Sequence, residues 1–247
     1  MNNLFNLFYT IALWSYTISA FFTHAIIYSL TKYFVKNKRE WSFILTKPFI
    51  SLSFSLFACP LTINGLENIQ QDKNFIIASN HQSILDIFIH FKGLTKPISF
   101  FAKQELTKIP ILGWNIKEQG HFIVDRKRPK KAVKQLAEVK AHLISGYSAI
   151  FFPEGTRSLD DSVGPFKRGA FLLAAQTGTT IIPAYIHGSN HVIHKTRHLS
   201  MPSKLSVTYG KPIPVERAKT KIEEKEIAEK LLKKVRDEML SLSGGRA

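Results

Sequence analysis

Hydrophobic positions divide the chain into an apolar N-terminal segment and a longer segment of mixed character. Residues 1–31 contain no Lys, Arg, Asp or Glu and are rich in Leu, Ile, Phe and Tyr. As a helix, this run could cross a hydrocarbon core of about 30 Å. A second, shorter apolar stretch covers residues 41–58 and is interrupted at Lys47-Pro48. We expect residues 1–58 to form a membrane-associated helical hairpin whose first helix spans or is deeply embedded, with buried core helices as the alternative.

From about Leu61 the pattern changes to short apolar runs that alternate with polar, helix-periodic stretches. Buried strands are expected at 75–78, 98–101, 122–124, 149–152, 180–186 and 205–209. Helices are expected from Pro129 to Gly146, from Arg168 to Gln176, and in a C-terminal amphipathic segment that Thr220 and Glu223 open at capping-box spacing. Several strands lack alternation, which is typical of strands covered on both faces. Residues 59–247 are therefore predicted to be α/β, with a mostly parallel central sheet flanked by helices.

The formal net charge of +16 favours an anionic partner, such as nucleic acid, an anionic membrane or a phosphorylated small molecule. The sequence has no helix-turn-helix, zinc-finger or RNA-binding consensus, so we expect no nucleic acid partner. Five cations against one acid between Lys32 and Lys47 would place the end of a spanning first helix in the cytoplasm. The single cysteine, Cys59, excludes an internal disulfide and a multi-cysteine zinc site.

His81 and Asp86, in the run Asn80-His81-Gln82-Ser83-Ile84-Leu85-Asp86, are candidates for a general base and its carboxylate partner. On a continuous helix, residues five apart point about 140° away from each other. The pair can meet only if His81 precedes a helix that contains Asp86. The strand expected at 75–78 supplies such a strand-to-helix corner, where Asp86 could orient the imidazole. Taken alone, a structural histidine is the common alternative.

A second motif, Phe152-Pro153-Glu154-Gly155-Thr156-Arg157, directly follows an expected strand. The carboxyl ends of parallel strands are where α/β sheets bind ligands. The planar guanidinium of Arg157 suits a phosphate, and Gly155 would let a substrate approach the backbone. Arg126, at the end of Gly120-His121-Phe122-Ile123-Val124-Asp125-Arg126, follows another strand in the same way.

These motifs, together with Ile181-Ile182-Pro183-Ala184, come in an order that resembles the glycerolipid acyltransferase family, which includes the 1-acylglycerol-3-phosphate acyltransferases. The resemblance covers about residues 60–215. It implies that His81 is the general base and Asp86 its partner. It further implies that the substrate, with its phosphate, is held by Lys103, Arg126, Glu154, Gly155 and Arg157. Phe122 comes one place earlier than the family pattern expects, and Ile84 stands where some members have tryptophan.

The resemblance implies transfer of a fatty acyl group from acyl-CoA or acyl carrier protein to the sn-2 hydroxyl of 1-acylglycerol 3-phosphate (lysophosphatidic acid). The product would be phosphatidic acid, made in phospholipid synthesis at the inner, cytoplasmic membrane by a domain that faces the cytoplasm. No cofactor and no metal are expected. Glycerol 3-phosphate or another lysophospholipid remains open as the acceptor. A non-catalytic membrane lipid-binding protein is the alternative of another class, although binding alone would not require both His81 and Asp86.

Four histidines, His187, His191, His194 and His198, are spaced as one face of a helix would be and could in that case bind a metal. Gly188 and the preceding strand argue against a continuous helix. We therefore expect a loop here and no metal site.

Overall fold

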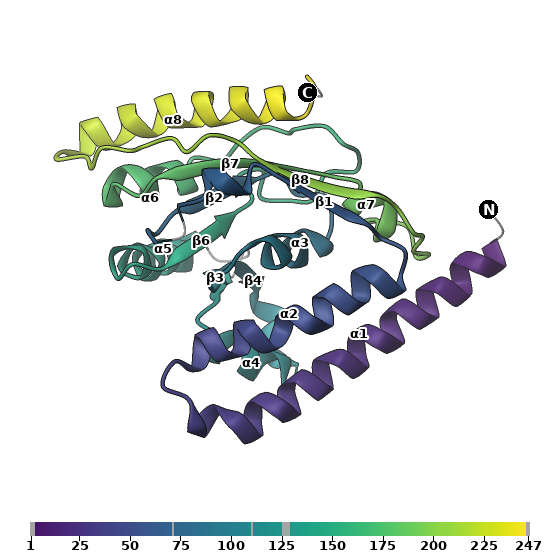
Figure 1. Cartoon of the computed structure of the whole chain (residues 1–247). Coiled ribbons are helices and arrows are strands. Elements are labelled where there is room, and N and C mark those ends of the chain that lie inside the picture. Colours follow the sequence, from purple (N-terminus) through teal and green to yellow (C-terminus); the bar gives the residue numbers. More distant parts are fainter. Residues whose placement is uncertain (1–2, 71, 110, 125–128, 246–247) are drawn as a thin grey trace.

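The computed structural model describes residues 3–70, 72–109, 111–124 and 129–245. A central sheet lies between two layers of helices, with α8 on one side and α3, α2 and α1 on the other (Figure 1). The α/β fold class predicted from the alternating pattern is confirmed.

The main sheet has six strands, and every neighbouring pair but one is parallel. Their order across the sheet is β1 (Leu61–Asn64), β8 (Leu205–Tyr209), β7 (Ile181–His187), β2 (Ile76–Ser79), β6 (Ser148–Phe151) and β3 (Ile98–Ser99). Only β7 and β8 run antiparallel. The central position of β2 means that the residues following it lie beside the ends of both β6 and β7.

Successive residues of the central strands face opposite helix layers, which explains their continuous apolar runs. Ile77, Ile150 and Ile182 share a core with α2 (Lys38–Leu56) and α3 (Leu85–Gly93). The opposite core holds Ile76 and Ile181, together with residues from α5 (Pro129–Ile144), α6 (Gly169–Thr177) and α8 (Lys221–Leu242). Both faces of the sheet are therefore covered, as the absence of alternation predicted.

Helix α8 begins and packs as its sequence predicts. The Thr220 hydroxyl accepts the backbone N–H of Glu223 at 3.2 Å, which satisfies one of the unpaired donors of the first turn. The side chains of Leu231, Val235 and Met239 are buried on one face.

The two N-terminal helices, α1 (Asn3–Thr31) and α2, run antiparallel along the side of the molecule opposite α8 (Figure 1). They are joined by η1 (Lys32–Phe34), and the Tyr16 hydroxyl donates to the Phe49 carbonyl at 2.8 Å. Helix α2 continues through Pro48 instead of stopping there, and Phe43, Ile50 and Phe54 join the core shared with α3. Within the described residues, Asn3–Phe34 is the one helical segment long and apolar enough to cross a membrane, by length and composition. The division at residues 58 and 59 stays a prediction.

The expected strand at 98–101 is in fact two strands in two sheets. Strand β3 ends at Ser99 and pairs with β6, whereas β4 (Phe101–Lys103) pairs with β5 (Phe122–Val124) in a separate parallel pair. An apolar run marks a buried strand but does not say which neighbour it pairs with. Several short elements were not predicted, namely β1, η2 (Leu66–Asn68), η3 (Gln104–Lys108), α4 (Leu112–Glu118) and α7 (Ser189–Val192).

Candidate active site

His81 and Asp86 meet at the corner where β2 runs into α3. Strand β2 ends at Ser79 and α3 begins at Leu85, so His81 lies before the helix and Asp86 in its first turn. Nδ1 of His81 lies 2.8 Å from Oδ2 of Asp86. The contact that the spacing of five residues required is therefore confirmed.

The carboxylate of Asp86 is fully buried and is held by several donors. The backbone N–H groups of Gln82 and Ser83 donate to Oδ2 at 2.8 and 2.9 Å. The hydroxyl of Ser189, from α7, donates to Oδ1 at 2.6 Å. Since both oxygens only accept, Nδ1 of His81 carries the proton, and Nε2 presents a lone pair.

The loop after β6 holds His81 at three points. The imidazole stacks on the Phe152 ring with centroids 4.0 Å apart and planes inclined by 16°. The backbone N–H of His81 donates to Oε1 of Glu154 at 3.2 Å, and its carbonyl accepts the Ser158 N–H at 2.7 Å. The side chain of His81 is 15% exposed, and no described residue makes a hydrogen bond to Nε2. The nitrogen with the lone pair is thus left for an incoming group.

Glu154 points back toward His81 and is almost fully buried. Burial raises the pKa of Glu154 to about 7, an effect partly offset by hydrogen bonds from the backbone of His81 and Gly164 and reinforced by the charge of Asp86. What the structure places at this carboxylate is the backbone of the histidine. A contact between Glu154 and substrate stays a prediction.

Gly155 has a positive φ of 73°, a conformation that favours glycine. A Cβ at this position would lie 2.6 Å from Nζ of Lys167, so the space beside the glycine is occupied by a lysine side chain. The approach of a substrate to the Gly155 backbone stays a prediction. The positive φ makes glycine the favoured residue for this turn.

Arg157 is half-buried next to the residue that binds the His81 carbonyl. Nζ of Lys195 donates to the Arg157 carbonyl at 2.7 Å and to the Thr156 hydroxyl at 3.2 Å. Lys167 and Lys195 therefore add positive charge to a loop that already carries Arg157. Neither lysine was found from the sequence, because neither lies within a motif.

The two other predicted phosphate ligands are placed differently. Lys103 ends β4, is exposed, and its Nζ lies 3.4 Å from Oε1 of Glu105. Arg126 lies outside the described residues. The roles of both in substrate binding stay predictions.

Asn80 aligns the two strand ends that carry the site. Its side-chain amide donates to the Ile186 carbonyl at 2.8 Å, and its side-chain oxygen accepts the Ile186 N–H at 2.7 Å. This pair of bonds joins the end of β2 to the end of β7, which places the residues after β7 beside Asp86.

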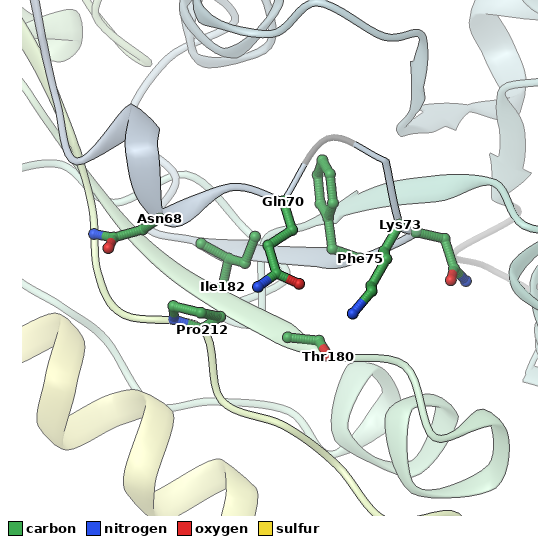
Figure 2. A pocket seen from close by; sticks show the side chains of 8 residues that line it. Asn68, Gln70, Lys73, Phe75, Thr180, Ile182 and Pro212 are labelled. Atoms are coloured by element: carbon green, nitrogen blue, oxygen red, sulfur yellow. The ribbon is translucent and has the colours of Figure 1, made fainter.

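A small pocket elsewhere in the sheet is separate from this site. Figure 2 shows it between Phe75, Thr180, Ile182 and Pro212, at the amino ends of β2 and β7. His81 follows the opposite, carboxyl end of β2. The pocket therefore has no contact with the candidate base.

The four-histidine segment does not form a helical face. Strand β7 runs to His187, and α7 has only four residues. Nδ1 of His187 and Nε2 of His191 lie 3.4 and 3.9 Å from Oδ2 of Asp161. In the part of the chain that the structure describes, no group of three or more His, Cys, Asp or Glu side chains is placed to hold a metal ion.

A family profile described as Acyltransferase matches residues 60–187, a little more than half of the chain. The chain belongs to the acyltransferase family. The matched segment of this acyltransferase contains His81, Asp86 and the loop that ends in Arg157. Ser189 lies just beyond it.

Individual relatives agree with the family. The chain is 33% identical over 187 residues to a 1-acyl-sn-glycerol-3-phosphate acyltransferase of Chlamydomonas reinhardtii, an alignment covering 75% of this chain and 53% of that protein. It is 34% identical over 149 residues to the enzyme of that name from Pseudomonas aeruginosa, covering 60% of this chain and 57% of that protein. The chain thus spans about half the length of the curated relatives it matches.

A solved structure resembles the whole fold. The crystal structure of the 1-acyl-sn-glycerophosphate (LPA) acyltransferase PlsC from Thermotoga maritima superposes with a TM-score of 0.81 at 27% identity. The match covers 97% of this chain and 98% of that one. The similarity therefore includes the N-terminal helices as well as the sheet.

Proposed function

We propose that the protein transfers a fatty acyl group from a thioester donor to the sn-2 hydroxyl of 1-acylglycerol 3-phosphate and so makes phosphatidic acid. The observation that carries the proposal is the His81–Asp86 contact, held by the same loop that carries Arg157. This arrangement combines a base with a cation suited to phosphate. The activity after which the relatives are named supports the choice of acceptor.

His81 acts as the general base through Nε2. Asp86 holds the Nδ1–H and stabilises the imidazolium that forms when the acceptor hydroxyl loses its proton. The stacked Phe152 ring and the bond to Asp86 orient the imidazole, and the two backbone bonds hold the main chain of His81. The base is thereby positioned before the substrate arrives.

The reaction is a direct transfer. As Nε2 takes the proton, the acceptor oxygen forms a bond to the thioester carbonyl carbon, and the C–S bond then breaks. The leaving thiolate receives the proton from the imidazolium, which leaves an ester and a free thiol. No acyl-enzyme is required, and no cofactor or metal takes part in these steps.

Arg157 binds the phosphate of the acceptor, assisted by Arg126 and Lys103. A guanidinium can donate two parallel hydrogen bonds to a phosphate, which orients the acceptor as well as binding it. Lys167 and Lys195 contribute further positive charge beside the same loop. The acyl donor is acyl-CoA or acyl carrier protein.

We further propose that the protein is attached to the cytoplasmic face of an inner, anionic membrane through α1 and α2. The outward surface of these helices carries exposed apolar side chains, among them Leu4, Phe8, Ile11, Ile18, Phe22, Ile26, Leu30, Ile44, Leu52 and Leu56. A row of exposed apolar side chains along two helices is typical of a membrane or protein contact. Phospholipid synthesis, which uses lipid acceptors, fits this location.

The test is an acyl-transfer assay with the purified full chain in lipid vesicles. The acceptors are 1-acylglycerol 3-phosphate, glycerol 3-phosphate and a lysophospholipid with a blocked phosphate, each with an acyl-CoA and an acyl carrier protein donor. We expect phosphatidic acid from the first acceptor and little product from the third. Absence of transfer to every acceptor from both donors would overturn the proposal in favour of a lipid-binding protein.

The variant Arg157→Ala identifies the group that the arginine binds. Loss of a hydrogen bond to a charged group costs about 1.5–3 kcal/mol, so the KM for the acceptor should rise by roughly 10- to 100-fold while the donor KM changes little. Arg157→Lys should restore only part of the loss, because an ammonium lacks the planar pair of donors. An effect confined to the donor KM would assign the loop to the donor's phosphates.

A further inference from the structure

Ser189 lies outside every motif of the sequence, yet it contacts the carboxylate partner of the base. Its side chain is fully buried and its hydroxyl donates to Oδ1 of Asp86 at 2.6 Å. The same hydroxyl lies 3.4 Å from Oε1 of Gln82. The shorter bond to the charged acceptor is the stronger of the two.

The backbone around Ser189 is built to deliver this hydroxyl. Gly188 has φ of 88°, and a Cβ there would lie 2.2 Å from the Lys204 carbonyl oxygen. The chain therefore turns sharply at the end of β7. The two bonds from Asn80 to Ile186 hold that strand end beside β2. Together these contacts place Ser189 next to Asp86 across 103 residues of sequence.

The two oxygens of Asp86 have different partners. Oδ2 accepts from His81 and from the backbone of Gln82 and Ser83, all within five residues in the sequence. Oδ1 accepts from Ser189, which comes from a different strand end. Without Ser189, the buried Oδ1 would lose the one hydrogen bond that the described residues give it. The carboxylate would then be held through Oδ2 alone, and its plane would be less firmly fixed.

We propose that Ser189 is a positioning residue for the acyl transfer. It fixes the plane of the Asp86 carboxylate so that Oδ2 faces Nδ1 of His81. Ser189 touches neither substrate nor the reacting atoms and acts through Asp86 alone. The inference rests on the proposed function.

The experiment compares Ser189→Ala with the wild type in steady-state acyl transfer across a range of pH. We expect kcat to fall by about tenfold, the lower end of the loss for one hydrogen bond to a charged group, with the acceptor KM unchanged within about twofold. Because a less firmly held carboxylate would stabilise the imidazolium less, the acidic limb of the kcat/KM profile should move to lower pH. A merely structural loss would lower the amount of active enzyme and leave the profile in place.

Ser79→Ala is the matched control. Ser79 is also fully buried, two residues before His81, and its hydroxyl has no hydrogen-bond partner among the described residues. This variant should keep the wild-type kcat and pH profile. Ser189→Cys places a larger and weaker donor at this buried position and should therefore not restore the wild-type kcat.

A double variant decides whether Ser189 acts through Asp86. In the Asp86→Asn background, Ser189→Ala should have little further effect, because the carboxylate that it positions is gone. Equal loss in both backgrounds would overturn the proposal, as would wild-type kinetics for Ser189→Ala. If the wild type itself transferred no acyl group, the proposed function would fail instead, which is a different outcome.

Discussion

At the scale of single residues, His81 is the side chain on which the proposed chemistry depends. His81→Ala should lower kcat by about 10²–10⁴-fold, because it removes proton transfer, and should leave the acceptor KM nearly unchanged. Asp86→Asn should also be severe, since an amide does not stabilise an imidazolium. His198→Ala, at an exposed position, is the control. A His81→Ala variant with more than about a tenth of the wild-type kcat would exclude His81 as the base.

Glu154 gives a prediction for stability against pH. Its pKa of about 7 in the folded protein lies above the ordinary value of 4.5, so the folded state binds the proton more tightly than the unfolded state. The free energy of unfolding therefore contains a contribution that falls as pH rises from about 4.5 to about 7. Glu154→Gln lacks this contribution. The stability of Glu154→Gln relative to the wild type should therefore rise as the pH is raised from 5 to 8, by up to about 3 kcal/mol.

Thermal unfolding at the two pH values measures this difference. Glu67→Gln, which changes an exposed glutamate in the same way, should follow the wild type at both. If the stability difference between Glu154→Gln and the wild type did not change with pH, the pKa of Glu154 would not be raised by its burial.

Two residues illustrate what sequence reasoning reached and what it did not. The His81–Asp86 contact could be predicted because both residues lie in one motif, and the strand before them fixes the corner. Ser189 could not, because a spacing of 103 residues carries no periodic signal. The sequence did carry one signal. Ser189 is a small polar residue that follows Gly188 just after an apolar strand, and the carboxyl ends of strands are where such sheets bind ligands.

At the scale of elements, the strands next to the site were predictable and their partners were not. β2, β6 and β7 are buried on both faces, so their sequences are mostly apolar, with polar residues only at strand ends. β1 is a short edge strand with alternating burial, which a four-residue run does not separate from a loop. Residues 98–103 divide into two strands because β3 pairs with β6 and β4 pairs with β5. These partners lie about 50 and about 20 residues later in the sequence, so the local pattern does not reveal them.

Arg39 joins helix α2 to the body of the molecule. Its guanidinium donates to the Ser99 hydroxyl at 2.8 Å and to Nε2 of His142 at 3.2 Å, and it lies 4.5 Å above the Tyr147 ring. Burial, and after it the charge of Arg39, lowers the pKa of His142 to about 4, so Nε2 is unprotonated and can accept. This cluster ties the N-terminal helices to both β3 and α5.

Arg39→Ala should therefore destabilise the protein through the contact between α2 and the body. Two lost hydrogen bonds are worth about 2 kcal/mol, which in a chain of this size lowers Tm by about 4–8 °C. The kcat of the folded fraction should stay near the wild-type value. Lys36→Ala, which removes an exposed cation a few residues away, should leave Tm unchanged within error. An unchanged Tm for Arg39→Ala would mean that this cluster does not hold α2.

At the scale of the whole molecule, the apolar surface of α1 and α2 predicts how the protein partitions. It should remain with membranes in about 1 M NaCl, where the Debye length is about 3 Å and electrostatic attachment is screened, and also after carbonate washing. The double variant Ile18→Glu, Phe22→Glu should release a larger fraction, because both side chains lie on the exposed face of α1. Lys211→Glu changes the net charge by the same amount at an exposed position on the body and should stay attached.

Release of the wild type by salt alone would contradict an embedded segment.

The fold class and the N-terminal apolar helix could be predicted from the sequence, since both follow from hydrophobic pattern and length. The packing of α2 into the core with α3 was not, because Phe43, Ile50 and Phe54 belong to the same apolar stretch as the exposed Ile44 and Leu52.

The long sequence separations of the contacts around His81 also set when the site can first exist. The base bonds to residues 73 and 77 positions later in the chain, and Asp86 to one 103 positions later. Synthesis runs from the N-terminus, and native contacts cannot form before both partners have been made. A growing chain thus exposes its apolar helices first, then its histidine, and gains the serine that supports the aspartate only after residue 189. During translation, the segment that can reach a bilayer is ready long before the catalytic group is assembled.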